Sequence, residues 1–422
     1  MKILVIGKGG REHALGWKVS SSPLCKKLYF LPGNGGTATI GQNIEGDYND
    51  FDFVKSIIDD KDIDLVIVGP EDPIANGISD YLLNSKSRII APSSQVAFLE
   101  SSKIMAKRFM KKYNIPTAEF QVFVDYNEAV RYVKQIKKWP LVIKADGLCG
   151  GKGVVIAENA EDALNTIDDF MKNGRFGAAS RRIVVEEYLK GYEFSVFAFV
   201  DGDGYTILGD AIDYKPALDD DRGPNTGGMG SVSPCIFLTD GMKREVKEKI
   251  IERTIQGLGS EGLHYKGFLY FGLMWTEDGP YVLEYNVRMG DPETQALVMV
   301  DRRDWLFLFT EPSSLNGKWP SYNRTCVEVV LVSEGYPLKY EKGFEIQGLE
   351  DVKDATVFHA GTRIMDNKLI TWGGRVLNVV ACGKSLSEAR EKVYREVKKI
   401  RFKNMFYRRD IGDEKRWKGI LS

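Results

Sequence analysis

One segment of this sequence carries more information than any other: Val282-Leu283-Glu284-Tyr285-Asn286-Val287-Arg288-Met289-Gly290-Asp291-Pro292-Glu293-Thr294-Gln295. Because side chains alternate along a β-strand, every second residue from Leu283 to Val287 is predicted to face the core. Glu284, Asn286 and Arg288 would face the opposite side. Carboxylate and amide oxygens suit magnesium, which takes few protein ligands and fills its shell with phosphate and water. Arg288 would stabilise a transferring phosphoryl group or an acyl phosphate.

A helix is predicted to start directly after this strand. Asp291 is a candidate N-cap, Pro292 fits the first helical position, and Glu293 adds an acid to the first turn. The amino end of the helix would therefore lie beside the polar row. The alternative interpretation of the whole segment is a polar edge strand with a cross-strand ion pair.

A glycine-rich loop with a lysine on each side lies earlier in the chain, between two predicted strands: Lys144-Ala145-Asp146-Gly147-Leu148-Cys149-Gly150-Gly151-Lys152-Gly153-Val154. It is not a Walker A loop, because Asp146 stands at the first glycine position and Gly153 replaces the hydroxyl residue that binds magnesium. A flexible hairpin that lays its amides over a polyphosphate, with Lys144 and Lys152 supplying charge, explains these residue types. The alternative is a surface hairpin with solvated lysines.

A second glycine loop, Gly7-Lys8-Gly9-Gly10-Arg11-Glu12-His13, follows the first predicted strand and opens a helix. Its amides could hold an anion at the amino end of the helix. It fails as a dinucleotide fingerprint, because Glu12 stands where the last glycine is needed and no acidic residue follows at the right distance. The loop favours a small ligand that carries a phosphate over a nicotinamide or flavin cofactor; a tight strand–helix turn is the alternative.

Two further segments have residue types that fit a nucleotide site. In the segment 186–193, backbone groups at a strand end could bind adenine and Glu193 could bind ribose; a solvated acidic rim is the alternative. The segment 213–222 runs into Gly223-Pro224-Asn225-Thr226-Gly227-Gly228-Met229-Gly230, where glycine lets the backbone approach a ligand closely.

The composition narrows the function class. With 58 Lys and Arg against 59 Asp and Glu, the net charge of −1 gives no support for a nucleic-acid coat or a polybasic membrane binder. The five cysteines are scattered without a CxxC pair, so neither a disulfide framework nor a zinc site is indicated, and no histidine lies near Cys149 to activate it as a nucleophile. No apolar run reaches the ~18 residues of a membrane span. We therefore expect a soluble cytoplasmic protein.

The order of strand and helix patterns predicts an α/β and α+β multidomain fold. In the first hundred residues, short apolar runs alternate with helices and end in turn signals, which is typical of a doubly wound parallel sheet. The expected domains are an N-terminal α/β substrate domain over 1–101, a core over 102–322 with a lid inserted at about 119–189, and a small C-terminal α+β domain over 323–422.

Taken together, the glycine hairpin, the segment before Glu193 and the E-x-N-x-R strand resemble an ATP-grasp ligase. Within that superfamily the chain is similar over essentially its whole length to the glycinamide ribonucleotide synthetase family. The most specific part of the likeness is the pair formed by the Gly223–Gly230 loop and the Asn286–Gln295 segment. Further matching motifs are Gly7–Ala14, Pro32–Asn34, Gly69–Glu71, Ala145–Leu148, Gly267–Tyr270, His359–Thr362, Gly373–Val376 and Arg409–Gly412.

The resemblance implies a reaction in purine synthesis. ATP would phosphorylate the carboxylate of glycine, and the amine of 5-phosphoribosylamine would attack the acyl phosphate, giving glycinamide ribonucleotide, ADP and phosphate. The implied cofactors are ATP as co-substrate and Mg²⁺ or Mn²⁺. We expect only small-molecule partners, with neither nucleic acid nor membrane involved, and a monomer or weak dimer. The alternative is another purine-pathway ATP-grasp carboxylate–amine ligase or carboxylase.

Matching positions assign roles to individual residues, with Asp213, Lys215 and Arg288 as the catalytic ones. The other assigned residues are Lys103, Lys144, Gly147, Gly151, Lys152 and Gly153 for the ATP phosphates, Glu186, Leu189 and Glu193 for adenosine, Glu284 and Asn286 for the metal, Asn225, Thr226, Gly227, Gly228, Met229, Gly290, Asp291, Pro292, Glu293 and Thr294 for the reacting centre, and Gly9, Gly10, Arg11 and Glu12 for the sugar phosphate.

The chain departs from the family pattern in two places. Cys149-Gly150 replaces an alanine pair in the lid loop but keeps Gly151-Lys152-Gly153. Where the family reads Asp-His-Lys-Arg, this chain has Asp213-Tyr214-Lys215-Pro216, which removes any expected substrate role for Tyr214 and Pro216. A non-catalytic nucleotide-binding regulator would not need the metal-binding row that the chain retains.

Overall fold

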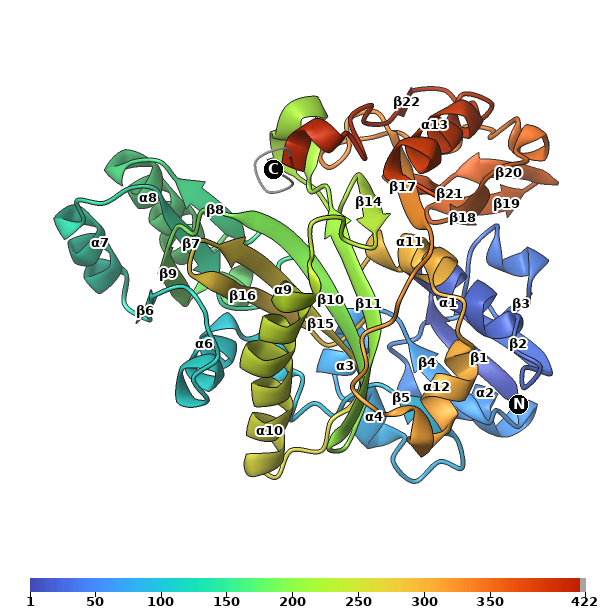
Figure 1. The fold of residues 1–422 in the computed structure, drawn as a ribbon, viewed down its shortest axis with the longest axis horizontal. Helices are drawn as coiled ribbons and strands as arrows, with labels where there is room; N and C mark the ends of the chain where they lie inside the picture. Colours follow the sequence, from blue (N-terminus) through green and yellow to red (C-terminus); the bar gives the residue numbers. More distant parts are fainter. Residues whose placement is uncertain (418–422) are drawn as a thin grey trace.

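The N-terminal part is an α/β layer. A computed structural model of the chain describes residues 1–417. Its first elements are β1 (Lys2–Gly7), α1 (Gly10–Ser20), β2 (Lys27–Pro32), β3 (Gln42–Asn43), α2 (Phe51–Lys61), β4 (Leu65–Val68), α3 (Glu71–Ala75), α4 (Ile78–Tyr81), β5 (Arg88–Ile90) and α5 (Phe98–Ser101). The strands form a parallel sheet in the order β3-β2-β1-β4-β5 (Figure 1), which confirms the predicted doubly wound parallel sheet.

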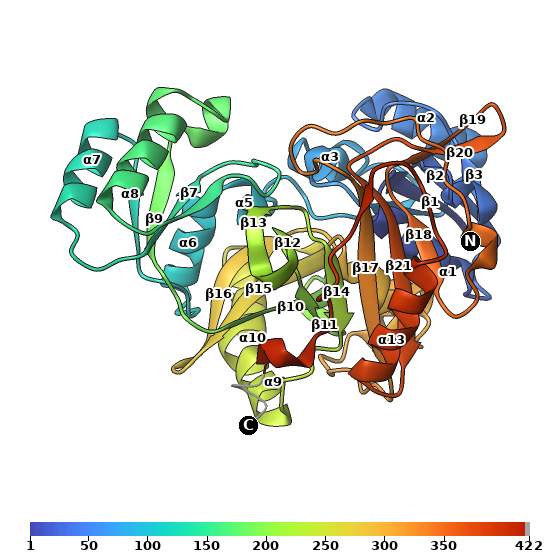
Figure 2. The ribbon, with the colours of Figure 1, turned by 90° about the horizontal axis from the view of Figure 1, so that it is seen from above.

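A lobe that projects from the rest of the molecule follows in the chain (Figure 2). Helix α6 (Lys103–Lys112) leads into it and is capped by Ser102, whose hydroxyl accepts a hydrogen bond from the Met105 amide at 3.2 Å. The lobe contains β6 (Phe120–Phe123), α7 (Tyr126–Gln135), β7 (Leu141–Ala145), β8 (Val154–Ala157), α8 (Ala160–Ile167) and β9 (Ile183–Glu187). Its antiparallel sheet, in the order β6-β9-β7-β8, encloses a separate apolar core that includes Ile143, Ile167 and Phe170.

The centre of the molecule is built from long antiparallel strands and four helices. They are β10 (Tyr192–Asp201), β11 (Gly204–Asp213), β12 (Pro216–Leu218), β13 (Arg222–Asn225), β14 (Gly230–Ser233), α9 (Asp240–Val246), α10 (Glu252–Ser260), β15 (Lys266–Thr276), β16 (Gly279–Asn286), α11 (Glu293–Val300) and α12 (Trp305–Thr310). A wider helical turn over Lys247–Ile251 joins α9 to α10, so the helical stretch runs from Asp240 to Ser260.

The C-terminal strands continue the central sheet. They are β17 (Thr325–Ser333), β18 (Thr356–His359), β21 (Arg375–Gly383) and β22 (Met405–Phe406), with the hairpin β19 (Thr362–Met365) and β20 (Lys368–Thr371) and the helix α13 (Leu386–Val397). The strand order is β16-β15-β10-β11-β14-β17-β21-β18, because β14 pairs with β17 from Gly230 to Ser233. Hydrogen bonding therefore runs without a break across the expected boundary near residue 322.

Two local predictions about the central strand and its helix are wrong. The register of β15 and β16 shifts between Gly272 and Leu273, so Leu283 is an extra, bulged residue. Leu283 consequently faces the cavity described below, and Val282 takes its place in the core. Helix α11 begins at Glu293 with Pro292 as its N-cap, one residue later than predicted.

One disulfide is present, although the cysteine spacing indicates no disulfide framework. Cys326 and Cys382 lie directly opposite each other on β17 and β21 and form a disulfide. Their pairing depends on strand register over a separation of 56 residues, which no local spacing pattern reveals. Cys25, Cys149 and Cys235 are free thiols.

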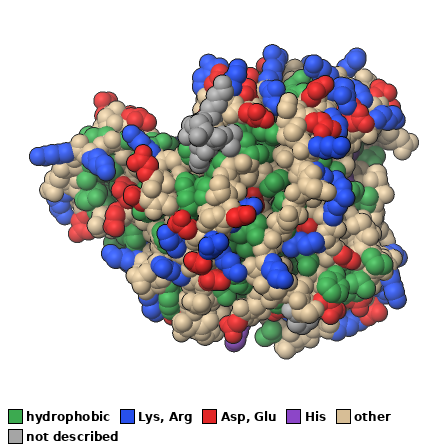
Figure 3. Space-filling model, viewed as in Figure 1, with side chains coloured by type: hydrophobic (Ala, Val, Ile, Leu, Met, Phe, Trp, Pro, Cys, Tyr) green, Lys and Arg blue, Asp and Glu red, His purple; other side chains and the backbone are tan. Residues whose placement is uncertain are grey.

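The surface carries both signs of charge. On the face shown in Figure 3, Lys and Arg side chains are interspersed with Asp and Glu side chains. This mixture agrees with the net charge of −1. Among residues 1–417, every helix is too short or too polar to cross a membrane.

A pair of histidines, His13 buried and His359 partly buried, joins the N-terminal part to the C-terminal strands. The His13 Nδ1 atom on α1 accepts a hydrogen bond of 2.9 Å from the His359 amide at the end of β18, and the two rings lie 5.6 Å apart. Burial and the neighbouring His359 lower the pKa of His13 to about 3, and burial lowers the pKa of His359 to about 4. Both imidazoles are therefore neutral in the folded protein at neutral pH.

We predict that acid destabilises this junction. Because the folded-state pKa values lie below the ordinary value of about 6.5, the unfolded chain binds protons first as the pH falls, and each histidine costs about 2 kcal/mol of stability by pH 5. Urea unfolding at pH 7.5 and pH 5 should show a smaller loss for His359→Asn than for the wild type, by about 2 kcal/mol. Equal losses in the two proteins would contradict this account.

Candidate active site

A cavity of about 360 Å³ lies where the N-terminal layer, the lobe and the central sheet meet. It gathers residues that are far apart in the sequence, from Arg11 to Arg375. The predicted site residues that line it are Arg11, Lys103, Lys144, Gly151, Gly153, Glu186, Asp213, Lys215, Thr226, Gly227, Glu284, Asn286, Arg288, Gly290, Asp291 and Glu293.

The remaining predicted site residues lie outside this lining. Met229 is fully buried and packs against Val330 and Val332 in a small apolar cluster, whereas Asn225 and Lys152 are exposed. The others outside the lining are Gly9, Gly10, Glu12, Gly147, Leu189, Glu193, Gly228, Pro292 and Thr294.

Two lysines are fixed at the lobe side of the cavity. The Glu186 Oε2 atom lies 3.1 Å from Lys107 Nζ and 3.0 Å from Lys144 Nζ, and these three side chains are at most 7% exposed. Lys144 Nζ also donates a hydrogen bond of 3.0 Å to the carbonyl of Leu283, the bulged residue. Burial lowers the pKa of Lys107 to about 8, although Glu186 opposes that shift. The site therefore holds preorganised cations beside the glycine loop.

The strand β16 presents the pair of oxygen ligands that the sequence predicts. Both Glu284 and Asn286 line the cavity, and neither side chain is engaged by another residue within the range 1–417. Burial raises the pKa of Glu284, but the charges of Lys215 and Lys144 outweigh it and the net shift is downward. An ionised carboxylate beside an uncommitted amide oxygen fits magnesium. Over the described residues, no group of three or more His, Cys, Asp or Glu could hold a metal ion.

Arg288 is held between two carboxylates of the N-terminal layer. Its Nη2 atom lies 3.0 Å from Glu100 Oε1, and its Nε atom lies 3.4 Å from Glu71 Oε2. Glu100 also accepts a hydrogen bond of 2.7 Å from the Val287 amide. The charge of Arg288 lowers the pKa of Glu71 to about 2. The guanidinium is thus oriented from two sides, which sequence analysis did not foresee, because Glu71 and Glu100 lie some 190–220 residues away.

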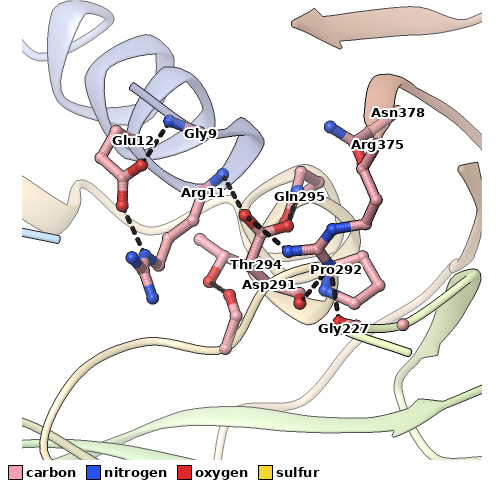
Figure 4. A network of polar contacts seen from close by, with 12 residues as sticks. Gly9, Arg11, Glu12, Gly227, Asp291, Pro292, Thr294, Gln295, Arg375 and Asn378 are labelled. Atoms are coloured by element: carbon pink, nitrogen blue, oxygen red, sulfur yellow. Dashed lines mark hydrogen bonds and ion pairs between the residues drawn. The ribbon is translucent and has the colours of Figure 1, made fainter. Parts of the chain in front are cut away.

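Asp291 links three parts of the chain (Figure 4). Its carboxylate accepts hydrogen bonds from Gln295 Nε2 at 2.9 Å and from the Arg11 amide at 3.4 Å, and it lies 3.5 Å from Arg375 Nη2. Arg375 also donates to the carbonyls of Asp291 and Gly227. Sequence analysis missed Arg375 as a site residue. The only signal was the Gly373–Val376 motif, which says nothing about distant partners.

In the first glycine loop, the side chain of Glu12 takes up one of the loop's own backbone amides. The Gly9 amide donates a hydrogen bond of 2.6 Å to Glu12 Oε2, and Arg11 Nε pairs with the same carboxylate (Figure 4). A side chain thus occupies one of the amides that we expect to hold a phosphate. Arg11 Nη1 donates to the Met289 carbonyl at 3.1 Å, so the loop is fixed to the central segment.

Tyr214 and Pro216, which depart from the family pattern, contact the C-terminal segment. The buried Tyr214 hydroxyl accepts a hydrogen bond of 2.9 Å from the Gly412 amide, and the Arg416 guanidinium lies 4.6 Å from its ring. The Pro216 carbonyl accepts from Arg408 at 3.0 Å. Both residues therefore anchor the C-terminal segment. Burial raises the pKa of the Cys149 thiol, which makes it a poor nucleophile.

A family model of an ATP-grasp domain matches residues 101–294, which makes the protein a member of the ATP-grasp class. Over 96% of this chain, the fold matches a biotin carboxylase from Campylobacter jejuni with a TM-score of 0.73, covering 92% of that chain, at 15% sequence identity, which shows a shared fold alone. The particular family follows from models of its N, ATP-grasp and C domains, which match residues 1–100, 101–294 and 326–414: the chain belongs to the phosphoribosylglycinamide synthetase family. The family resemblance inferred from the motifs is confirmed.

Similar proteins cover the chain from end to end. A phosphoribosylamine–glycine ligase from Caldanaerobacter subterraneus subsp. tengcongensis is 44% identical over 97% of this chain and 99% of its own length. One from Escherichia coli O157:H7 is 42% identical over 100% of this chain and 99% of its own length. The crystal structure of a phosphoribosylamine–glycine ligase from Thermotoga maritima matches with a TM-score of 0.86 at 37% identity, covering 97% of this chain and 100% of that one.

We predict that neutralising Glu186 destabilises the protein. Glu186→Gln leaves Lys107 and Lys144 buried together without a counter-charge, and the loss of unfolding free energy should be about 3 kcal/mol. Glu187→Gln is the matched control, because the half-exposed Glu187 lies next to it on β9 outside the cavity. Urea unfolding followed by tryptophan fluorescence measures both; equal stability of the two variants would contradict the buried-pair interpretation.

Proposed function

We propose that this protein is an ATP-dependent ligase that joins glycine to 5-phosphoribosylamine through glycyl phosphate and releases glycinamide ribonucleotide, ADP and phosphate. The observation that carries the proposal is a single cavity with fixed lysines on one wall and the free Glu284–Asn286 pair on another. This is the arrangement that phosphoryl transfer between a nucleotide and a carboxylate needs. Full-length relatives named phosphoribosylamine–glycine ligase support the choice of substrates.

Residues of the lobe and of α6 bind the nucleotide. Lys103, Lys144 and the loop 147–153 contact the phosphates, and each cation about 4 Å from a phosphate charge contributes roughly 4 kcal/mol at an effective dielectric of about 20. A Cβ atom at Gly151 would lie 3.9 Å from the Thr226 carbonyl, so the loop reaches across the cavity. Adenosine binds along Glu186, Leu189 and Glu193. The buried Glu186 Oε1 atom, which has no partner among residues 1–417, supports that assignment.

Glu284 and Asn286 hold the metal, which we propose to be Mg²⁺ or Mn²⁺. When bound, the metal ion neutralises phosphate oxygens and orients the nucleotide. Arg288, fixed by Glu71 and Glu100, stabilises the charge that develops on the transferred phosphoryl group and on the acyl phosphate. Positioning and charge are sufficient for this chemistry, so the enzyme needs no covalent nucleophile.

The remaining substrate assignments complete the proposal. The Gly223–Gly230 loop and the Gly290–Thr294 turn line the reacting centre, and the loop from Gly9 to Glu12 lies on the sugar-phosphate side. The enzyme works in the cytoplasm as a monomer or weak dimer, on small molecules alone.

An ADP-release assay tests the reaction. Turnover should require both glycine and 5-phosphoribosylamine, and hydroxylamine in place of the amine should give glycine hydroxamate. If bicarbonate and aminoimidazole ribonucleotide support comparable turnover instead, the protein is another purine-pathway ATP-grasp enzyme. Tight ATP binding without any product would identify a regulator.

We predict that Glu284→Ala lowers the metal-dependent kcat at least about 100-fold, because electrostatic groups at a reacting centre contribute on this scale. The melting temperature should change little, since the Glu284 carboxylate supports no other residue in the range 1–417. Glu277→Ala is the control: Glu277 is exposed in the turn that joins β15 to β16, at the other end of the same hairpin. Normal kcat in Glu284→Ala would remove Glu284 from the metal site.

A further inference from the structure

A buried glutamate lies directly behind the wall of the cavity. Glu328 is on β17, and its side chain is 0% exposed. In the central sheet, Ser231 of β14 lies opposite Asp213 of β11 on one side and opposite Glu328 on the other. The Ser231 hydroxyl also lies 3.1 Å from the carbonyl oxygen of Pro292, the N-cap of α11. Glu328 is thus one residue away from Asp213, which lines the cavity, yet it has no part in the reaction as proposed.

The hydrogen bonds around Glu328 require one more hydrogen than Ser231 has. Ser231 Oγ lies 2.8 Å from Glu328 Oε2 as well as 3.1 Å from the Pro292 carbonyl oxygen. A hydroxyl has a single hydrogen, whereas a carbonyl oxygen and an ionised carboxylate only accept. Ser231 donates to one of its two neighbours, so the other bond needs a hydrogen from elsewhere. A protonated Glu328 supplies it, because its O–H donates to Ser231 while the Ser231 hydroxyl donates to Pro292.

The surroundings of Glu328 also favour the neutral acid. Its other oxygen, Oε1, is buried without a hydrogen-bond partner within residues 1–417, which costs far more for a carboxylate than for an acid. The charged groups that face it are Asp291 and Glu293 on the α11 side and Arg375 on β21. Arg375 is already paired with Asp291 at 3.5 Å. Burial raises the pKa of Glu328 well above its ordinary value, and the two negative charges add to that shift, although Ser231 and Arg375 oppose it.

We propose that Glu328 is a positioning residue that acts as a neutral hydrogen-bond donor, and its effect on turnover rests on the proposed function. Through Ser231 it fixes the Pro292 carbonyl and hence the Gly290–Thr294 turn at the reacting centre. Because the donor is an acid, this chain of hydrogen bonds holds only while Glu328 is protonated. An ionised Glu328 is an acceptor, so Ser231 turns its hydrogen toward the carboxylate and the Pro292 carbonyl loses the Ser231 hydroxyl. Alkaline pH therefore loosens the turn.

Infrared spectroscopy of the folded enzyme tests the protonation state without any turnover. The difference between the wild type and Glu328→Gln at pH 7 should contain the carbonyl stretch of one buried carboxylic acid. Glu334→Gln, which should remove no such band, is the matched control, because Glu334 is exposed in the turn directly after β17. Carboxylate bands in place of the acid band would overturn the inference, whether or not the enzyme is a ligase.

Two substitutions of similar size give the kinetic test, with ADP release as the signal. Glu328→Gln keeps a donor for Ser231, so kcat/KM at pH 7 should stay within about threefold of the wild type. Glu328→Met fills the same space without a donor, and kcat/KM should fall about tenfold, the scale of one buried hydrogen bond, while KM for ATP stays within about threefold. Equal losses in the two variants would overturn the inference. No ADP release by the wild type would refute the proposed function and leave the decision to the infrared and melting measurements.

The pH dependence gives the third test. Because the folded-state pKa of Glu328 is raised, the unfolded chain loses this proton first as the pH rises, and stability is lost until the pH passes the folded-state pKa. The melting temperature should therefore fall less between pH 6 and pH 8.5 in Glu328→Gln than in the wild type. The alkaline decline of kcat/KM should also be weaker in that variant. Identical pH profiles of stability in the two proteins would overturn the inference.

Discussion

The ion pairs of Arg288 with Glu71 and Glu100 are the contacts on which the active-site geometry depends. They join the end of the central strand β16 to the carboxyl edge of the N-terminal parallel sheet. Parallel sheets bind ligands at that edge, whereas the central antiparallel sheet supplies rigid rows of side chains. Because the Arg288 guanidinium is fixed between two carboxylates, one wall of the cavity comes from the parallel sheet and another from the antiparallel sheet.

The balance of positive and negative side chains in the whole chain also holds among the residues that line the cavity. Lys103, Lys107 and Lys144 each have a carboxylate or a carbonyl partner, so these cations are not buried as unpaired charges. The Glu284 carboxylate, which has no ion-pair partner within residues 1–417, is the one to which we assign the metal. The charged groups of such a site all have partners only when its substrates and metal are bound.

Sequence patterns predict what depends on neighbours in the chain. The Glu284–Asn286 row follows from the alternation of side chains along a strand, and the structure places both residues at the cavity as expected. Sequence patterns fail where the pairing of distant strands determines the local structure. The bulge at Leu283 is an example, because it depends on the register of β16 against β15. The Cys326–Cys382 disulfide likewise needs the register of β17 against β21. Arg375 belongs to the same class, because its partners Gly227 and Asp291 meet it only after the sheet has formed.

The hydrogen-bonded pairing of β14 with β17 has a consequence for how this chain can be divided. Removal of the residues after the expected boundary near 322 would uncover the whole length of β14, whose four residues are all buried, as an open edge available to other chains. It would also take away Arg375 and one side of the apolar core. The ATP-grasp and C-terminal segments that the family models match therefore share one sheet and one apolar core, and separating them would expose both.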